Sequence, residues 1–206
     1  MVSNVGLLYV GAVLFINSLL LLGRIDGKSA AVFNIFIGLL QVFTPIYLII
    51  NADGDLLTIL SASGIFLFGF TYLYVGLTNW FNLKTDGLGW YCLWVAVLAL
   101  GFSFVNFYYF SDIKFGIIWI FWSFLWLLFF LLLGLGKPID NYVGKVTLVQ
   151  SWITDTIPSF LSLAGLWEQI SIIVASIIAL IAVVYFIYLY FSTETREQLK
   201  KSREIA

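Results

Sequence analysis

The chain has 206 residues, of which 62% are hydrophobic and 10% are charged, and its formal net charge is −1. Soluble domains carry about 25% charged residues, so this composition excludes a soluble protein and predicts one all-α integral membrane domain with no nucleic-acid partner. The chain contains no histidine, which removes the commonest general base, the commonest metal ligand and the usual proton switch between pH 5 and 8. We therefore expect no enzyme, no metal and no cofactor.

Seven stretches are long and apolar enough to cross a bilayer, which takes about 20 mostly apolar residues. Short polar hinges containing Gly, Asp or Asn join them, as expected for turns. The sixth stretch is the most polar and contains Pro158; without it the count would be six. The predicted spans are 4–22, 29–50, 57–79, 88–110, 115–135, 146–166 and 169–192.

The basic residues predict the orientation of these spans. With seven helices, all Lys and Arg residues except Lys114 fall on one side of the membrane. Cytoplasmic loops are enriched in Lys and Arg, so the N-terminus is expected outside and the C-terminus inside. With six helices the basic tail, residues 193–206, would fall outside and break this pattern, so seven is the preferred count.

The first span carries Leu7, Val10, Leu14 and Asn17 on one stripe, which by itself is typical of ordinary helix packing. In the third span, Phe70 and Tyr74 lie four residues apart and share a face, while Tyr72 points elsewhere. On aromatic content alone, packing is the favoured interpretation for these residues also.

The fifth span contains Trp119, Trp122 and Trp126. Their i, i+3, i+7 spacing places the three indoles on one face of a helix. Tryptophans that anchor a helix at the lipid interface cluster at its ends, whereas these run through its upper and middle part. They either pack against a neighbouring helix or line a path, and the spacing does not decide between the two.

The sixth span contains Asp155, the one acidic residue deep inside an apolar stretch. A buried ionisable group is a functional candidate because its burial is costly unless it is paired or wet. It could equally form a hydrogen bond with Thr154 or Thr156. Gln150 in the same span and Asn17 in the first are buried amides, which in membranes often tie helices together.

Together these segments resemble the bacterial UreI/AmiS family of urea channels and short-chain amide transporters. The matching pieces follow the family's order and cover roughly residues 5–167. They are LLYVGAVL, DGKSAAVFN, LFGFTYLY, GWYCLWVAV, IIWIFWSFLWL and ITDTIPSFL.

The resemblance implies a six-helix channel core over residues 1–167, made of two inverted three-helix halves, with an additional helix at 168–192 and the basic cytoplasmic tail at 193–206. It implies passive conduction of urea and short amides through a pore in each protomer, a homohexamer around membrane lipid in the bacterial inner or plasma membrane, and a functional link to a cytoplasmic urease or amidase. The pore-lining residues it implies are Leu7, Val10, Leu14, Asn17, Phe70, Tyr74, Trp119, Trp122, Trp126 and Gln150.

The chain also departs from this family. Counting without gaps from Trp126 and Pro158 places Gln150 where the family's urea channels can carry a pore glutamate. The absence of histidine argues against histidine-based acid gating, which leaves Asp155 and Glu168 as the pH-sensitive candidates. Two other functions stay open: a channel for ammonia or water, and a seven-helix receptor-type protein.

Overall fold

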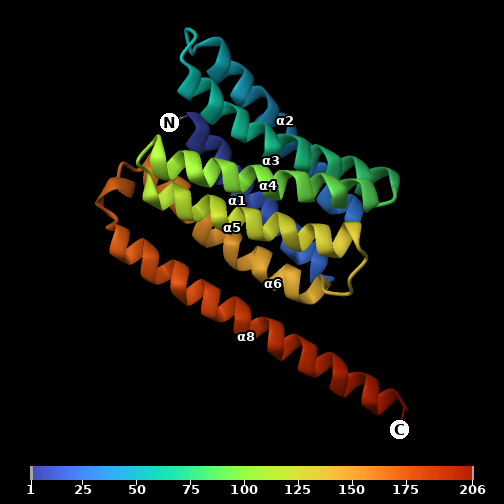
Figure 1. Cartoon of the computed structure of the whole chain (residues 1–206). Coiled ribbons are helices and arrows are strands. Elements are labelled where there is room, and N and C mark those ends of the chain that lie inside the picture. Colours follow the sequence, from blue (N-terminus) through green and yellow to red (C-terminus); the bar gives the residue numbers. More distant parts are fainter. Residues whose placement is uncertain (1, 206) are drawn as a thin grey trace.

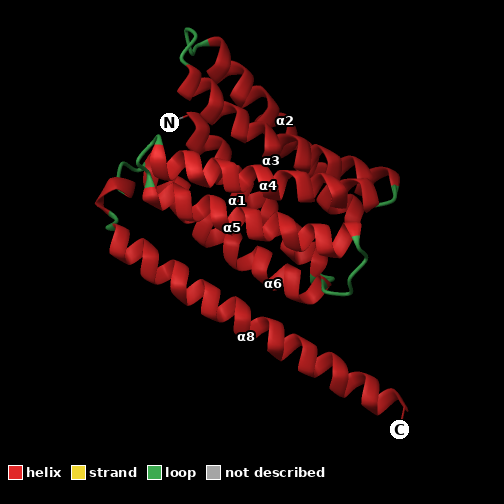
Figure 2. Ribbon diagram, viewed as in Figure 1, coloured by secondary structure: helices red, strands yellow, loops and turns green. Residues whose placement is uncertain are grey.

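The computed structural model describes the backbone of residues 2–205 and the side chains of residues 2–192, and within these ranges all regular structure is helical (Figures 1 and 2). The side chains of the tail predicted at 193–206 lie outside this description. The helices are α1 (Val2–Leu21), α2 (Gly27–Ile50), α3 (Leu56–Phe81), α4 (Asp86–Tyr108), α5 (Ile113–Phe129), the π-helical η1 (Phe130–Gly134), α6 (Asp140–Gln150), the π-helical η2 (Ser151–Thr156), α7 (Ile157–Leu163), the 3₁₀ turn η3 (Trp167–Gln169) and α8 (Ile172–Ile205).

Six of the described helices are long and apolar enough to cross a membrane: α1, α2, α3, α4, α5 with its continuation η1, and α8. The sixth predicted span, 146–166, is also helical, but the helix runs from residue 140 to 163 and is divided into α6, η2 and α7. Pro158 lies at the start of α7 and cannot donate a backbone hydrogen bond. The π turn of η2 lies directly before it, as such turns do where a regular helical ladder is interrupted.

The helices pack most closely as three antiparallel pairs, which are α2 with α3, α4 with α5 and η1, and α1 with the α6–η2–α7 segment. The last pair joins the two ends of the bundle's sequence, because Gly11 of α1 faces Ser151 and Gly144 of α6 faces Leu21. The closest contacts are thus two hairpins and one pair that joins the beginning and the end of the six-helix core. In all three pairs the backbones of the two helices lie close together.

Glycines allow this approach at the pair interfaces. A Cβ on Gly89 of α4 would overlap the backbone of Gly134 in η1, and a Cβ on Gly11 would lie 2.9 Å from the Ser151 carbonyl oxygen. Small residues have this role in membrane bundles, where apolar surface alone gives no preference for helix over lipid. The three pairs surround the buried aromatic and aliphatic side chains of the core.

Helix α8 lies on the outside of this bundle, along α5 and α6 (Figure 1). Phe186 of α8 contacts the rings of Phe121 and Phe124, each with a centroid distance of 6.1 Å. At the start of the connection to α8, the Lys114 ammonium donates a hydrogen bond to the Trp167 carbonyl oxygen at 2.8 Å. The additional helix is thus fixed at its beginning and along its length, and its residues Ala182, Phe186 and Leu189 join the buried cluster from outside.

We predict that Gly89→Ala destabilises the bundle, because the added methyl group forces α4 away from η1; overpacking of this kind costs about 1–3 kcal/mol. Gly101→Ala is the matched control, since Gly101 lies on the same helix with no neighbouring atom within 4 Å of its Cβ position. Thermal unfolding in detergent should show a lower midpoint for the first variant and an unchanged or higher midpoint for the second. Equal midpoints would contradict the close contact.

Candidate functional site: two cavities that meet at an aromatic constriction

One cavity, of about 310 Å³, lies between α1, α3, α4 and α5 at the end of the bundle that carries Asp140. Its wall is mostly apolar with hydroxyl and amide groups at intervals. The residues used below are Leu14, Asn17, Phe68, Thr71, Tyr72, Thr78, Trp122 and Trp126. We call it the Asp140-side cavity.

A second cavity, of about 300 Å³, lies at the opposite end, where α1 begins and where Asp112 caps α5. Its wall combines amides and aromatic rings. The residues used below are Leu7, Gln41, Gly64, Phe68, Trp119 and Trp122. We call it the Asp112-side cavity.

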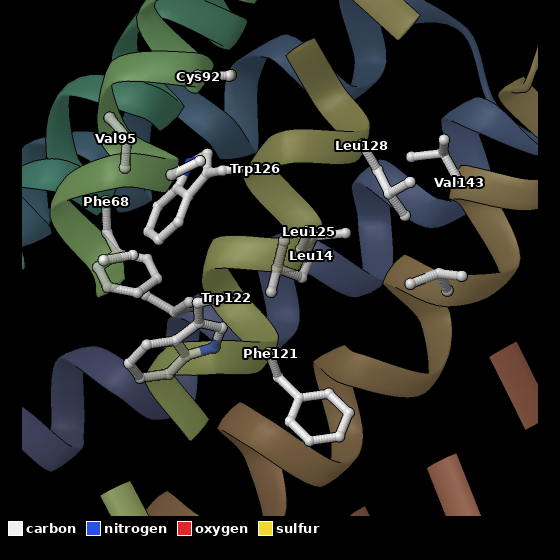
Figure 3. Packing of buried hydrophobic residues seen from close by; sticks show 14 of the residues in the cluster. Leu14, Phe68, Cys92, Val95, Phe121, Trp122, Leu125, Trp126, Leu128 and Val143 are labelled. Carbon is white, nitrogen blue, oxygen red and sulfur yellow. The ribbon is translucent and has the colours of Figure 1, made fainter. Parts of the chain in front are cut away.

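Phe68 and Trp122 line both cavities, so the two spaces meet at these rings. The Phe68 ring lies 4.8 Å from the Trp122 ring in an edge arrangement of 81°, and 4.8 Å from the Trp126 ring. Figure 3 shows Phe68 beside both indoles. Trp119 extends the cluster, with its ring 4.9 Å from that of Trp122. These four rings form the aromatic constriction, and the tryptophans both pack and line the cavities.

The contribution of α3 differs from the expectation. Phe70 and Tyr74 are 49% and 36% exposed on the outer face of the bundle and line neither cavity. The inward rings are Phe68 and Tyr72 instead, which are also four residues apart. A shift of two residues turns a helical side chain by about 200°. The face of α3 that points inward is therefore opposite to the one that carries Phe70 and Tyr74.

Three of the four residues predicted on the first helix line a cavity. Leu14 and Asn17 line the Asp140-side cavity and Leu7 lines the other, whereas Val10 is fully buried and lines neither. The Asn17 amide exchanges two hydrogen bonds with Asn34 of α2, at 2.9 and 2.7 Å. This pair ties α1 to α2 beside the cavity and holds the Asn17 side chain in a fixed position.

Trp122 is anchored from behind by the π turn η2. Its indole N–H donates to the Thr154 hydroxyl oxygen at 3.1 Å and lies 3.4 Å from Asp155 Oδ2. Thr154 also lies 2.7 Å from Asp155 Oδ2. Asp155 is completely buried and lines neither cavity, so it supports the aromatic constriction without contacting its open side.

The remaining predicted residues lie away from the cavities. Gln150 is completely buried, its side-chain nitrogen and oxygen have no hydrogen-bond partner, and it lines neither cavity. Glu168 lies in the connection to α8, where its exposed carboxylate is 3.4 Å from the Lys114 ammonium. The described side chains contain no group of three or more Cys, Asp or Glu residues that could hold a metal ion.

Sequence reasoning overlooked Gln41 of α2 and the inward face of α3. That face reads Phe68, Thr71, Tyr72, Val75 and Thr78, a 3.6-residue spacing that mixes rings with hydroxyls. The mixture of polar and aromatic groups on one stripe was the available signal. Gln41 is a buried amide in an apolar helix, where such a group is expected to have a partner or a functional role.

A bundle of membrane-spanning helices with two internal cavities meeting at an aromatic constriction defines a multi-pass helical membrane protein of the channel or transporter class. The family model described as AmiS/UreI family transporter matches residues 2–166, and the chain belongs to this family. Helix α8 lies beyond the matched region.

Relatives with this architecture include transporters and channels. The chain is 49% identical over 164 residues to a Rhodococcus erythropolis protein named as transporter protein AmiS2, covering 79% of this chain and 80% of that protein. It is 30% identical over 192 residues to the acid-activated urea channel of Helicobacter pylori, covering 78% of this chain and 97% of the channel. The crystal structure of the Helicobacter pylori urea channel superimposes with a TM-score of 0.73 at 28% identity, covering 81% of this chain and 99% of that one.

We predict that Thr154→Val destabilises the bundle, because the Trp122 indole N–H loses its nearer acceptor and Asp155 Oδ2 loses the Thr154 hydroxyl; losing such a buried partner costs about 1–3 kcal/mol. Thr147→Val is the matched control, since this buried hydroxyl donates only to the Val143 carbonyl oxygen of its own helix. Thermal unfolding should show the larger decrease for Thr154→Val. Equal decreases would mean that the bond to Trp122 contributes nothing.

Proposed function

We propose that the protein is a passive channel for urea and short-chain amides, which pass between the two cavities through the aromatic constriction. The observation that carries this proposal is that Phe68 and Trp122 line both cavities. A single rearrangement of these rings connects the two ends of the bundle. The names of the relatives, a urea channel and two amide or AmiS-type transporters, support the same class of solute.

Planar neutral solutes suit such a route. A slot between flat rings accepts a planar molecule by stacking, and stripping water from an amide without replacement costs about 2–7 kcal/mol. Hydroxyl and amide groups such as those of Asn17, Thr71 and Tyr72 lie along the wall to offer replacement hydrogen bonds. Strong sites would trap the solute, so weak contacts in series suit conduction. The rings offer ions no substitute for their hydration shell, so ions are excluded.

Short-chain amides belong among the proposed permeants. The chain is 49% and 48% identical to relatives named for AmiS2 and amidate substrates, against 30% for the urea channel. We propose that the solute serves a urease or amidase on the cytoplasmic side. Flux that is confined to water or ammonia, with none of urea or acetamide, would contradict the proposed solute class.

We further propose a homohexamer in the bacterial inner membrane, with the N-terminus outside. The orientation is supported by the positions of Arg24, Lys84 and Lys137, which lie in the connections at the Asp140 end of the bundle. The Asp140-side cavity would then open to the cytoplasm. Exposed aromatic and aliphatic side chains on α4, including Trp90, Trp94, Val97 and Phe104, are suited to lipid or to a neighbouring protomer.

We predict that Trp122→Ala changes solute selectivity, because it removes the ring shared by both cavities and widens the constriction. Stopped-flow measurements in proteoliposomes at matched protein content should show a relative gain for larger amides over urea. Tyr74→Ala is the matched control, since this ring is on the outer face. If Trp122→Ala and wild type show the same flux for every solute, the constriction does not select.

We predict no acid activation with a midpoint near the ordinary histidine pKa of about 6.5, because the chain has no histidine. Side-chain and backbone hydrogen bonds from Thr58 lower the pKa of Asp55 below 3.8. A lowered pKa means that this cap of α3 stays ionised above pH 5 and is lost only at more acidic pH. Urea flux measured from pH 5 to 8 tests this. An activation that survives replacement of Asp53, Asp55, Asp112, Asp155 and Glu168 would exclude these five carboxylates as its origin.

A further inference from the structure

Two polar side chains in the cavity walls are buried without a hydrogen-bond partner. Gln41 Oε1 in the Asp112-side cavity and Thr78 Oγ1 in the Asp140-side cavity have none within the protein, and these residues are only 3% and 2% exposed. Other unpartnered buried atoms among the described side chains lie on residues that line neither cavity: Tyr91, Gln150, Asp155 and Trp167. Gln41 and Thr78 therefore differ from the rest because their residues line a cavity that a solute can occupy.

A polar group that is buried without a partner destabilises a protein, and a bilayer supplies no water to relieve it. Thr71 shows how the same wall satisfies such a group when it is structural. Its hydroxyl donates to the Leu67 carbonyl oxygen at 2.6 Å and accepts from the Trp126 indole at 3.3 Å. Thr78, two turns further along the same face of α3, has neither kind of bond. A molecule in the cavity that Thr78 lines can supply the missing partner.

Glycine residues leave space for the Gln41 carboxamide. A Cβ on Gly6 of α1 would overlap the Gln41 amide oxygen, and a Cβ on Gly64 of α3 would lie 3.1 Å from the Trp119 ring. Any larger residue at Gly6 would displace the carboxamide. The amide thus sits in a wall that also carries Trp119, Trp122 and Phe68, next to the constriction.

We propose that Gln41 and Thr78 are the hydrogen-bonding positions for the solute on the two sides of the aromatic constriction, and that Gln41 determines the preference for amides. The inference rests on the proposed conduction of urea and short amides. The Gln41 oxygen accepts from a solute N–H group, while the amide nitrogen of the same side chain can donate to the solute carbonyl. The Thr78 hydroxyl offers one donor and acceptor after the constriction has been passed.

The two positions also fit the requirement that a channel release its solute rapidly. Each cavity presents one such unpartnered side chain, and both are neutral, so the solute is held weakly on either side. The route offers a hydrogen-bonding group before and after the rings, where the solute has lost its water. An apolar solute of similar size gains nothing from either group.

The test is to measure flux and thermal stability together on the full chain in proteoliposomes and detergent. Gln41→Leu and Gln41→Met, and separately Thr78→Val, should lower urea and acetamide flux about tenfold, the factor that corresponds to one hydrogen bond. Their unfolding midpoints should stay equal to wild type or rise, because each change removes an unpartnered buried polar group. Thr78→Ser keeps the hydroxyl and should retain flux.

Thr44→Val is the matched control for Gln41, since Thr44 is buried on the same helix and lines neither cavity. It should conduct as wild type does. If wild type conducts and the Gln41 and Thr78 variants conduct equally well, the inference is overturned. It is also overturned if their flux loss is accompanied by a lower unfolding midpoint. Absence of urea and amide flux in folded wild type would instead overturn the proposed function.

Discussion

The contact of Phe68 with Trp122 and Trp126 is the interaction on which the rest of the interior depends. Both centroid distances are 4.8 Å, and they join α3 to α5 across the middle of the bundle. Each cavity ends at this contact, so the same rings that fill the core also divide the internal space. Rings suit this double role because they bury a large area yet turn about two bonds only. These residues therefore both pack the core and line the cavities.

Rings at a constriction need fixed orientation, and their indole N–H groups provide it. Trp126 is held by the Thr71 hydroxyl of α3 and Trp122 by the Thr154 hydroxyl of η2. The two acceptors come from different helices, α3 and η2. In η2 the π turn before Pro158 brings Thr154 and the buried Asp155 to the back of Trp122. A helical irregularity that a proline favours thus supports the constriction.

Much of the fold follows from composition and hydrophobic length, because a bilayer demands helices of about 20 apolar residues. The first helix was predictable in detail, since Asn17 marks its inner face. The third was not. Phe68 with Tyr72 and Phe70 with Tyr74 have the same spacing, and both faces of a membrane helix are apolar, so hydrophobicity does not say which face is inward. Only the hydroxyls of Thr71 and Thr78 distinguish the inner stripe.

The positions of the buried polar residues in the sixth span were predictable only in part. A buried carboxylate is a functional candidate, but the sequence does not say whether it faces a cavity or lies behind the residues that line one. Asp155 proves to lie behind the constriction, and Gln150 lies in the same segment away from both cavities. Where their side chains point is set by the π turn, whose one-residue shift in register cannot be seen in the hydrophobic pattern.

The hydrogen bonding of the buried polar groups is the basis for the proposed solute positions. Asn17 is paired with Asn34, and Lys114 with the Trp167 carbonyl, so these groups hold the bundle together. Gln41 Oε1 and Thr78 Oγ1 are unpaired and belong to residues that line the cavities on either side of the rings. The bilayer core supplies no water, so a partner reaches these atoms only through a cavity. For an amide oxygen beside an aromatic constriction, the proposed solute is such a partner.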